Sequence, residues 1–78
     1  MIKILSQNKD RIKDCYEVFI GRDEDRYIIN GNGKAYYEDR VELGVYSTKE
    51  KAQQVIIEIM QTLHSKNLNK IYIMPQDD

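Results

Sequence analysis

The sequence predicts an α+β fold in which one amphipathic helix packs on one face of a small antiparallel β-sheet, in the order β-β-β-β-β-α-β. Short β-branched and aromatic runs, separated by turn residues, fill the first part of the chain and return at its end. An Asn-Gly-Asn-Gly repeat lies between two of these runs, as is typical of a hairpin. Residues 47–64 combine a helix-capping motif with apolar residues at steps of three and four. We expect residues 1–78 to form a single domain, because this length leaves no room for a second core.

The first predicted strands surround two polar segments. Ile2–Leu5 alternates in polarity and ends in the polar residues 6–10, which indicates a short strand and then a loop. Residues 15–21 are β-branched and aromatic, so they predict a second strand. The charged residues 22–26 predict a turn, and residues 27–29 resume the strand pattern.

The Asn-Gly repeat at residues 30–33 predicts the tight turn of a hairpin, because both central residues of a type I′ turn need positive φ. The return strand is then expected at residues 34–39. Val41–Tyr46 predicts a further strand, since apolar residues alternate along it.

The predicted helix begins at a capping box. In the sequence Ser-Thr-Lys-Glu at residues 47–50, Ser47 is the expected N-cap and Glu50 the residue that reaches back to it. Asn67 is expected to end the helix, with Leu68 folding back on the last turn. Residues 70–74 predict the last strand. The core-facing stripe of the helix consists of Ala52, Val55, Ile56, Ile59, Met60 and Leu63.

Strict alternation assigns the strand side chains to two faces, of which the single helix covers only one. The covered face is expected to hold Ile4, Val18, Ile20, Val41, Leu43, Val45, Ile71 and Ile73. The opposite face is expected to hold Leu5, Phe19, Tyr46, Tyr72 and Met74, with Tyr27 or Ile28. This second face is apolar and rich in tyrosine, which suits a half-exposed sheet, a self-association surface or a ligand platform. Its candidate interface residues are Phe19, Tyr46, Tyr72 and Met74.

The cysteine and histidine content limits how the chain is stabilised. Cys15 is the single cysteine and His64 the single histidine, so neither an intramolecular disulfide nor a common Cys/His zinc site can form. A chain of this size buries only about 60% of its unfolded surface, which leaves a marginal core. Oligomerisation remains as a source of buried surface. We therefore expect a homodimer or a higher homo-oligomer.

The charge balance disfavours nucleic acid as the main partner. The net charge is −1, whereas nucleic-acid-binding domains usually carry a basic excess that neutralises phosphates. No apolar run approaches the ~18 residues that would cross a bilayer, and the N-terminus lacks the apolar core of a signal peptide. The lone cysteine suits a reducing compartment. We expect a cytoplasmic protein with no membrane partner.

No pattern in the sequence predicts catalysis, a metal site or a cofactor. His64 stands at the end of the helix, and no motif ties a Ser or Cys nucleophile to it. Cys15 is interpreted as a small buried apolar residue. The carboxylates are numerous, but no pair lies in an apolar setting that would separate their pKa values. The sequence therefore favours a non-enzymatic protein.

A group of basic and aromatic residues near the predicted hairpin is the candidate ligand site. Guanidinium groups and aromatic planes together suit a small anionic ligand that carries a ring. A solvated charged edge that prevents strand-to-strand aggregation explains the same residues at least as well. The group consists of Arg22, Arg26, Tyr27, Lys34, Tyr36, Tyr37 and Arg40.

Three stretches of the chain resemble a family of small, largely uncharacterised accessory proteins of Gram-positive bacteria and their phages. The stretches are KILSQ at the start, LGVYSTKEKAQQVIIEI at the strand-to-helix junction and YIMP near the end. Ile73 departs from the family pattern, which has an acidic residue there. The resemblance implies a compact accessory protein with no enzymatic residues to carry over, and its setting implies a counter-defence role. For a phage-encoded protein it also implies the host cytoplasm as the location.

Two functions remain as hypotheses, besides a purely structural or regulatory dimer. The first is a homo-oligomeric binding protein that sequesters a small anionic, nucleotide-derived signalling molecule. The alternative is a protein-interaction module that blocks a host defence protein with its terminal strand and the acidic residues after it.

Overall fold

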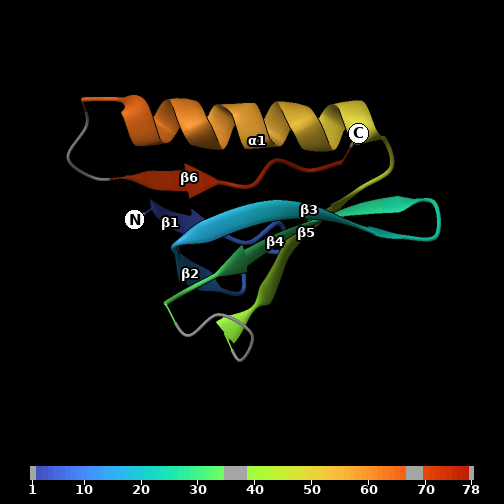
Figure 1. The fold of residues 1–78 in the computed structure, drawn as a ribbon, viewed down its shortest axis with the longest axis horizontal. Coiled ribbons are helices and arrows are strands. Elements are labelled where there is room, and N and C mark those ends of the chain that lie inside the picture. The colour runs from blue at the N-terminus through green and yellow to red at the C-terminus, as the bar shows by residue number, and fades with distance from the viewer. Residues whose placement is uncertain (1, 35–38, 67–69, 78) are drawn as a thin grey trace.

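The computed structural model describes residues 2–34, 39–66 and 70–77 and shows two small β-sheets with one helix packed on them (Figure 1). The α+β prediction and its order of elements are confirmed. The elements are β1 (Ile2–Leu5), β2 (Ile12–Cys15), β3 (Glu17–Asp23), β4 (Arg26–Asn32), β5 (Val41–Tyr46), α1 (Lys49–His64) and β6 (Ile71–Ile73). No helix in the described part of the chain is long and apolar enough to cross a membrane.

The first sheet has the order β2-β1-β6. It is a mixed sheet, whereas the sequence predicts a purely antiparallel one. β1 pairs antiparallel with β2 and parallel with β6. The predicted strand at residues 15–21 corresponds mainly to β3, and strand β2 at Ile12–Cys15 was missed in the sequence. Its charged residues hid the strand pattern, because Asp14 lies opposite Lys3 on the exposed face while Cys15 lies opposite the buried Ile2.

The second sheet has the order β3-β4-β5, and its first hairpin turns at the charged segment. Asp23 pairs with Arg26 across the two-residue turn, where Glu24 adopts a positive φ of 56°. The hairpin prediction for the Asn-Gly repeat is wrong, because residues 30–32 belong to β4. The expected return strand at residues 34–39 falls largely outside the described residues.

Gly31 serves packing in a strand rather than a turn. An added Cβ would lie 2.7 Å from Cys15 Sγ and 2.8 Å from Leu43 Cδ1. Among the described residues no glycine has a positive φ. A side chain at Gly31 would therefore clash where the two sheets approach each other.

The helix cap is shifted by one residue from the predicted capping box. Thr48 is the N-cap, and its hydroxyl accepts a hydrogen bond of 3.1 Å from the Lys51 amide. The Ser47 amide instead donates to the Asp77 carboxylate at 3.1 Å. Ser65 is the C-cap. The predicted helix stop at residues 67–68 lies outside the described residues.

The core combines both sheets with the inner stripe of α1. Within the helix, Ala52, Val55 and Ile59 are buried, whereas Met60 and Leu63 are partly exposed, so only part of the predicted stripe faces inward. The fully buried apolar residues are Ile2, Ile4, Cys15, Ile29, Leu43, Tyr46, Ala52, Val55, Ile59 and Met74.

A β-bulge corrects the predicted faces of β5. Ile29 pairs with Gly44, but the next residue, Asn30, pairs with Glu42, so Leu43 is the extra residue. Alternation therefore changes phase within the strand, and Tyr46 joins Leu43 in the core. Tyr46 was predicted on the opposite face.

The parallel pairing of β6 corrects its faces as well. Tyr72 lies opposite the buried Ile4 and is itself partly buried, packed against the core. Met74 follows on the same side and is fully buried. Ile71 and Ile73 thus point outward, although alternation had assigned them to the core.

Three segments that are far apart in the sequence meet beside β5. The Gln7 side chain accepts from the Val45 amide at 2.9 Å and donates to the Val45 carbonyl at 3.0 Å. The Tyr46 hydroxyl donates to the Pro75 carbonyl at 2.7 Å. Gln7 thus occupies the second edge of β5 as a neighbouring strand would. These contacts have a structural role.

Candidate binding surfaces

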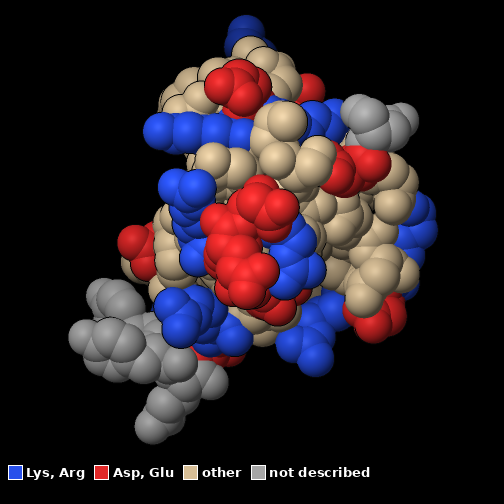
Figure 2. Space-filling view, turned by 90° about the vertical axis from the view of Figure 1, so that its right-hand side faces the viewer, with Lys and Arg blue, Asp and Glu red and all other residues tan. Residues whose placement is uncertain are grey.

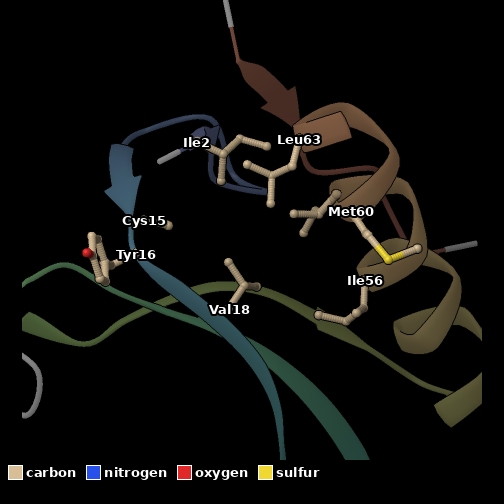
Figure 3. Close-up of a pocket in the computed structure, with 8 residues that line it drawn as sticks. Ile2, Cys15, Tyr16, Val18, Ile56, Met60 and Leu63 are labelled. Atoms are coloured by element: carbon tan, nitrogen blue, oxygen red, sulfur yellow. The ribbon is translucent and has the colours of Figure 1, made fainter. Parts of the chain in front are cut away.

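An open apolar groove lies between the C-terminal half of α1 and the segment that joins β2 to β3 (Figure 3). It has a volume of about 460 Å³. Ile56, Met60 and Leu63 of the helix face Tyr16 and Val18 across it. Met60 is 49% exposed and Tyr16 is 62% exposed, so the rim of the groove offers apolar surface to solvent.

The Cys15 thiol at the floor of the groove is unreactive at neutral pH. Cys15 is 2% exposed, and burial raises its pKa to about 11, against a smaller opposing effect of Lys13. A thiol with this pKa stays protonated at neutral pH, whereas the nucleophile would be the thiolate. The environment of Cys15 therefore matches its interpretation as a small apolar residue.

The outer face of the β2-β1-β6 sheet carries a second apolar surface. The register places Ile12, Leu5 and Ile73 in one row across the three strands. Ile12 is 70% exposed and Ile73 is 59% exposed. Ile71 is 56% exposed and lies in the next row, opposite Lys3. We call these four residues, Leu5, Ile12, Ile71 and Ile73, the outer face.

The predicted interface is largely inside the chain. Tyr46 and Met74 are buried in the core, so they cannot form a surface for a second molecule. The Tyr72 hydroxyl donates to the Glu58 carboxylate at 2.6 Å, and burial together with this bond raises the pKa of Tyr72. Phe19, which is partly exposed on β3, is the one predicted interface residue not tied to the core or the helix. The outer face was missed because alternation alone does not say which side of β6 faces inward.

The predicted basic group is divided between two ends of the second sheet. Arg22, Arg26 and Tyr27 lie at the β3–β4 turn. Arg40 precedes Val41, which pairs with Gly31 near the opposite end of β4. Lys34 follows the same end of β4, and Tyr36 and Tyr37 lie outside the described residues.

The hairpin part of this group forms a small hollow of about 340 Å³. The Arg22 guanidinium carbon lies 5.6 Å from the centre of the Tyr27 ring. Lys49, at the start of α1, lines the same hollow and was missed in the sequence because it lies far from the hairpin along the chain. Arg26 is paired with Asp23 at 2.9 Å. Figure 2 shows this end of the molecule, where acidic side chains gather at the centre with Lys and Arg side chains around them.

Within the described part of the chain, no group of three or more His, Cys, Asp or Glu side chains is placed to hold a metal ion. No protein-family model, no curated protein and no solved structure matches the chain.

Proposed function

We propose that the protein is a non-catalytic interaction module that holds a partner protein against the outer face of its β2-β1-β6 sheet. The observation that carries the proposal is the exposure of Ile12, Ile71 and Ile73 on one side of one sheet. Contiguous exposed apolar surface of this kind marks interaction sites in small soluble domains. The alternative function considered from the sequence, in which the terminal strand contacts a host protein, uses this same strand β6.

The shape and border of the outer face favour a protein over a small molecule. Small ligands bind in concave sites, whereas the outer face is the open side of a three-stranded sheet. Lys3 and Asp14 form an ion pair of 3.6 Å beside the apolar row. An apolar centre with charged groups at its border is the usual composition of a protein–protein interface. The partner we propose presents an apolar surface of its own.

The family resemblance supplies the setting of this proposal. Accessory proteins of phages act within a host cell, and a phage-encoded protein gains from blocking a host defence protein. We therefore propose a host defence protein as the partner. The resemblance supports the setting, and the outer face supports the mode of binding.

Affinity capture from host lysate tests the proposal with charge substitutions on the outer face. Ile73→Lys and Ile12→Lys place a cation where a partner would bury an apolar side chain. Gln61→Lys adds the same charge at an exposed position of α1 and is the matched control. We expect wild type and the control to retain the same host protein, and its affinity to fall at least about ten-fold for the outer-face variants. Equal retention by all four proteins, or by none, would reject the proposal.

A small anionic ligand is the second candidate, and the hollow at the β3–β4 turn favours it. Arg22 and Lys49 supply positive charge, and Tyr27 supplies an aromatic plane. Calorimetry with cyclic and linear nucleotides would compare Arg22→Ala with Arg40→Ala, which removes the same side chain at the other end of the sheet. Loss of one charge-assisted contact of roughly 1.5–3 kcal/mol should weaken binding about ten-fold or more in Arg22→Ala alone. If no nucleotide binds wild type at millimolar concentration, this candidate is rejected.

A further inference from the structure

Strand β3 is a long edge strand without the usual protection against pairing. It pairs with β4 on one side, and no other strand in the described ranges pairs with its second side. Its seven residues run in register with β4 without a bulge. The central residues 18–21 are Val, Phe, Ile and Gly, with no charge and no proline. Edge strands normally carry a bulge, a central charge or a proline, because an edge without them pairs readily with another strand.

The hydrogen-bonding groups of this edge follow from the hairpin. Residues that flank a two-residue turn form a hydrogen-bonded pair, and here they are Asp23 and Arg26. Hydrogen-bonded pairs alternate along an antiparallel ladder, so the odd-numbered residues of β3 direct their backbone groups to β4. The amides and carbonyls of Val18, Ile20 and Arg22 consequently point to the free edge.

The flank of α1 on the side of this edge begins with Lys49, which lines the hollow beside Ile20 and Gly21, and continues with apolar side chains. Ile56, Met60 and Ile57 follow one another around the helix on this side, and Ile56 and Met60 line the groove beside Val18. The opposite flank carries Glu58, whose carboxylate is bonded to Tyr72 of β6. Met60 and Ile57 are both more than 40% exposed. The helix therefore presents apolar side chains next to the unpaired strand.

We propose that a second copy of this chain binds here, with its β3 antiparallel to the first and the two strands centred on Phe19. Two three-stranded sheets would then join into one of six strands, with the two α1 helices on the same side of it. The apolar flanks of the helices meet across the two-fold axis and cover both grooves. This surface is distinct from the outer face, so the inference is independent of the proposed partner protein.

The sequence of β3 is self-complementary in this register. A two-fold axis perpendicular to a sheet keeps every side chain on its own face, so opposed residues differ by an even number. Centring on Phe19 pairs the two phenylalanines directly and places Val18 opposite Ile20 twice, where the free backbone groups of both point at each other.

The other registers are worse for this strand. Centring on Ile20 places Glu17 opposite Asp23 twice, and like charges in directly opposed positions are destabilising. Centring on Val18 pairs only residues 17–19 of β3. Centring on Gly21 pairs as many β3 residues as centring on Phe19, but it places Ile20 opposite Arg22 and Phe19 opposite Asp23, so apolar side chains face charged ones. A second copy supplies the apolar match by symmetry, because Val18 of each chain faces Ile20 of the other.

Disulfide trapping tests the contact and its register. In the proposed register the side chains at position 19 of the two copies have Cβ atoms about 4.5–5.5 Å apart, which suits a disulfide. Phe19→Cys should therefore give a covalent dimer after mild oxidation. Glu17→Cys is the matched control, because its two copies are four residues out of register and about 13 Å apart along the strand. Cys15 is present in both variants and is buried.

Light scattering over a concentration series provides the second measurement, on proteins without added cysteine. We expect wild type and Gln61→Lys to have the mass of two chains, and Met60→Lys to raise the dimer dissociation constant at least ten-fold. A wild-type monomer at tens of micromolar would overturn the inference. So would a dimer that resists Met60→Lys, is disrupted by Ile73→Lys and gives no trapped product from Phe19→Cys, since that dimer would use the outer face.

Discussion

Gly31→Ala is the sharpest test of how the two sheets pack. The new methyl would lie 2.7 Å from Cys15 Sγ and 2.8 Å from Leu43 Cδ1, well inside the ordinary carbon contact of about 3.5–4.0 Å. All three residues are buried, so neither neighbour has free space into which to move. Overpacking of this kind costs about 1–3 kcal/mol of unfolding free energy. For a domain of this size we therefore expect the melting temperature to fall by at least about 4 °C.

Thermal unfolding followed by circular dichroism would measure this loss, at one protein concentration because an oligomer's stability depends on concentration. Gly21→Ala is the matched control. Its Cβ would meet the side-chain Nδ2 of Asn30 at 3.1 Å, and this side chain can turn away. We expect the control to lose less than about 0.5 kcal/mol.

A double variant with Cys15→Ala identifies the cause of the loss. Removing the sulfur removes one of the two clashing atoms, so the double variant should lose less than the sum of the single variants by roughly 0.5–3 kcal/mol. Strict additivity, or Gly31→Ala with the stability of wild type, would refute the packing argument. If glycine were required at position 31 for a turn, Cys15→Ala would restore none of the unfolding free energy that Gly31→Ala loses.

Three further predictions follow from the cap, a buried phenol and the helix. Thr48→Ala is expected to lower the unfolding free energy by about 1 kcal/mol and Ser47→Ala by less; equal losses in urea denaturation would contradict the cap assignment. Burial, with the Asp77 carboxylate, raises the pKa of Tyr46 to about 12, so the native state keeps a proton that the unfolded chain releases near pH 10. Stability should be full below about pH 10 and fall as pH rises to about 12, and melts of Tyr46→Phe should show a weaker fall. Ile59→Asp buries an unpaired charge and should abolish the helical circular dichroism signal, whereas a melt close to wild type would contradict helix-on-sheet packing.

The sequence predicts those elements whose signal is local and repeated. The helix carries a cap, an apolar stripe and good helix formers in one uninterrupted segment, so its existence is confirmed and its start is wrong by one residue. Ser47 and Thr48 are both good N-cap residues, so the sequence alone does not decide which of them starts the helix. A distant contact accompanies the choice of Thr48, because the Ser47 amide donates to the Asp77 carboxylate. No local pattern contains this choice.

The faces of the strands were predicted less well because alternation needs a reference point. The bulge at Leu43 changes the phase of β5, and its sequence signal, Gly44 inside a strand, fits a close backbone approach as well as a bulge. The pairing of Tyr72 with Ile4 sets the phase of β6 through contacts with the start of the chain. Because of these two errors, Tyr46 and Met74 were assigned to the surface although they are buried, and Ile71 and Ile73 were assigned to the core although they are exposed. The predicted interface was therefore placed on the wrong residues.

The described residues of the candidate ligand site do not lie together, and the reason is related. A turn at the Asn-Gly repeat would have placed Arg22 and Arg40 near one another on two sides of a single hairpin. The chain turns earlier, at Glu24, so these two arginines lie toward opposite ends of the second sheet. Asn-Gly is a strong turn signal, but the close approach of Cys15 also requires glycine at Gly31. Glycine is favoured both in a tight turn and where another side chain approaches the backbone closely, and the sequence does not distinguish these two cases.

The two proposed surfaces act together if both are correct. The free edge of β3 and the outer face lie on different strands, so a dimer through β3 leaves each outer face open. The dimer would then present two identical binding surfaces, and a partner that is itself oligomeric would engage both. Binding at two linked sites can exceed the single-site affinity by about 10²–10⁴ without any new contact, provided that the geometry allows simultaneous engagement. A small chain with one modest apolar face would in this way bind more tightly than the area of that face alone permits.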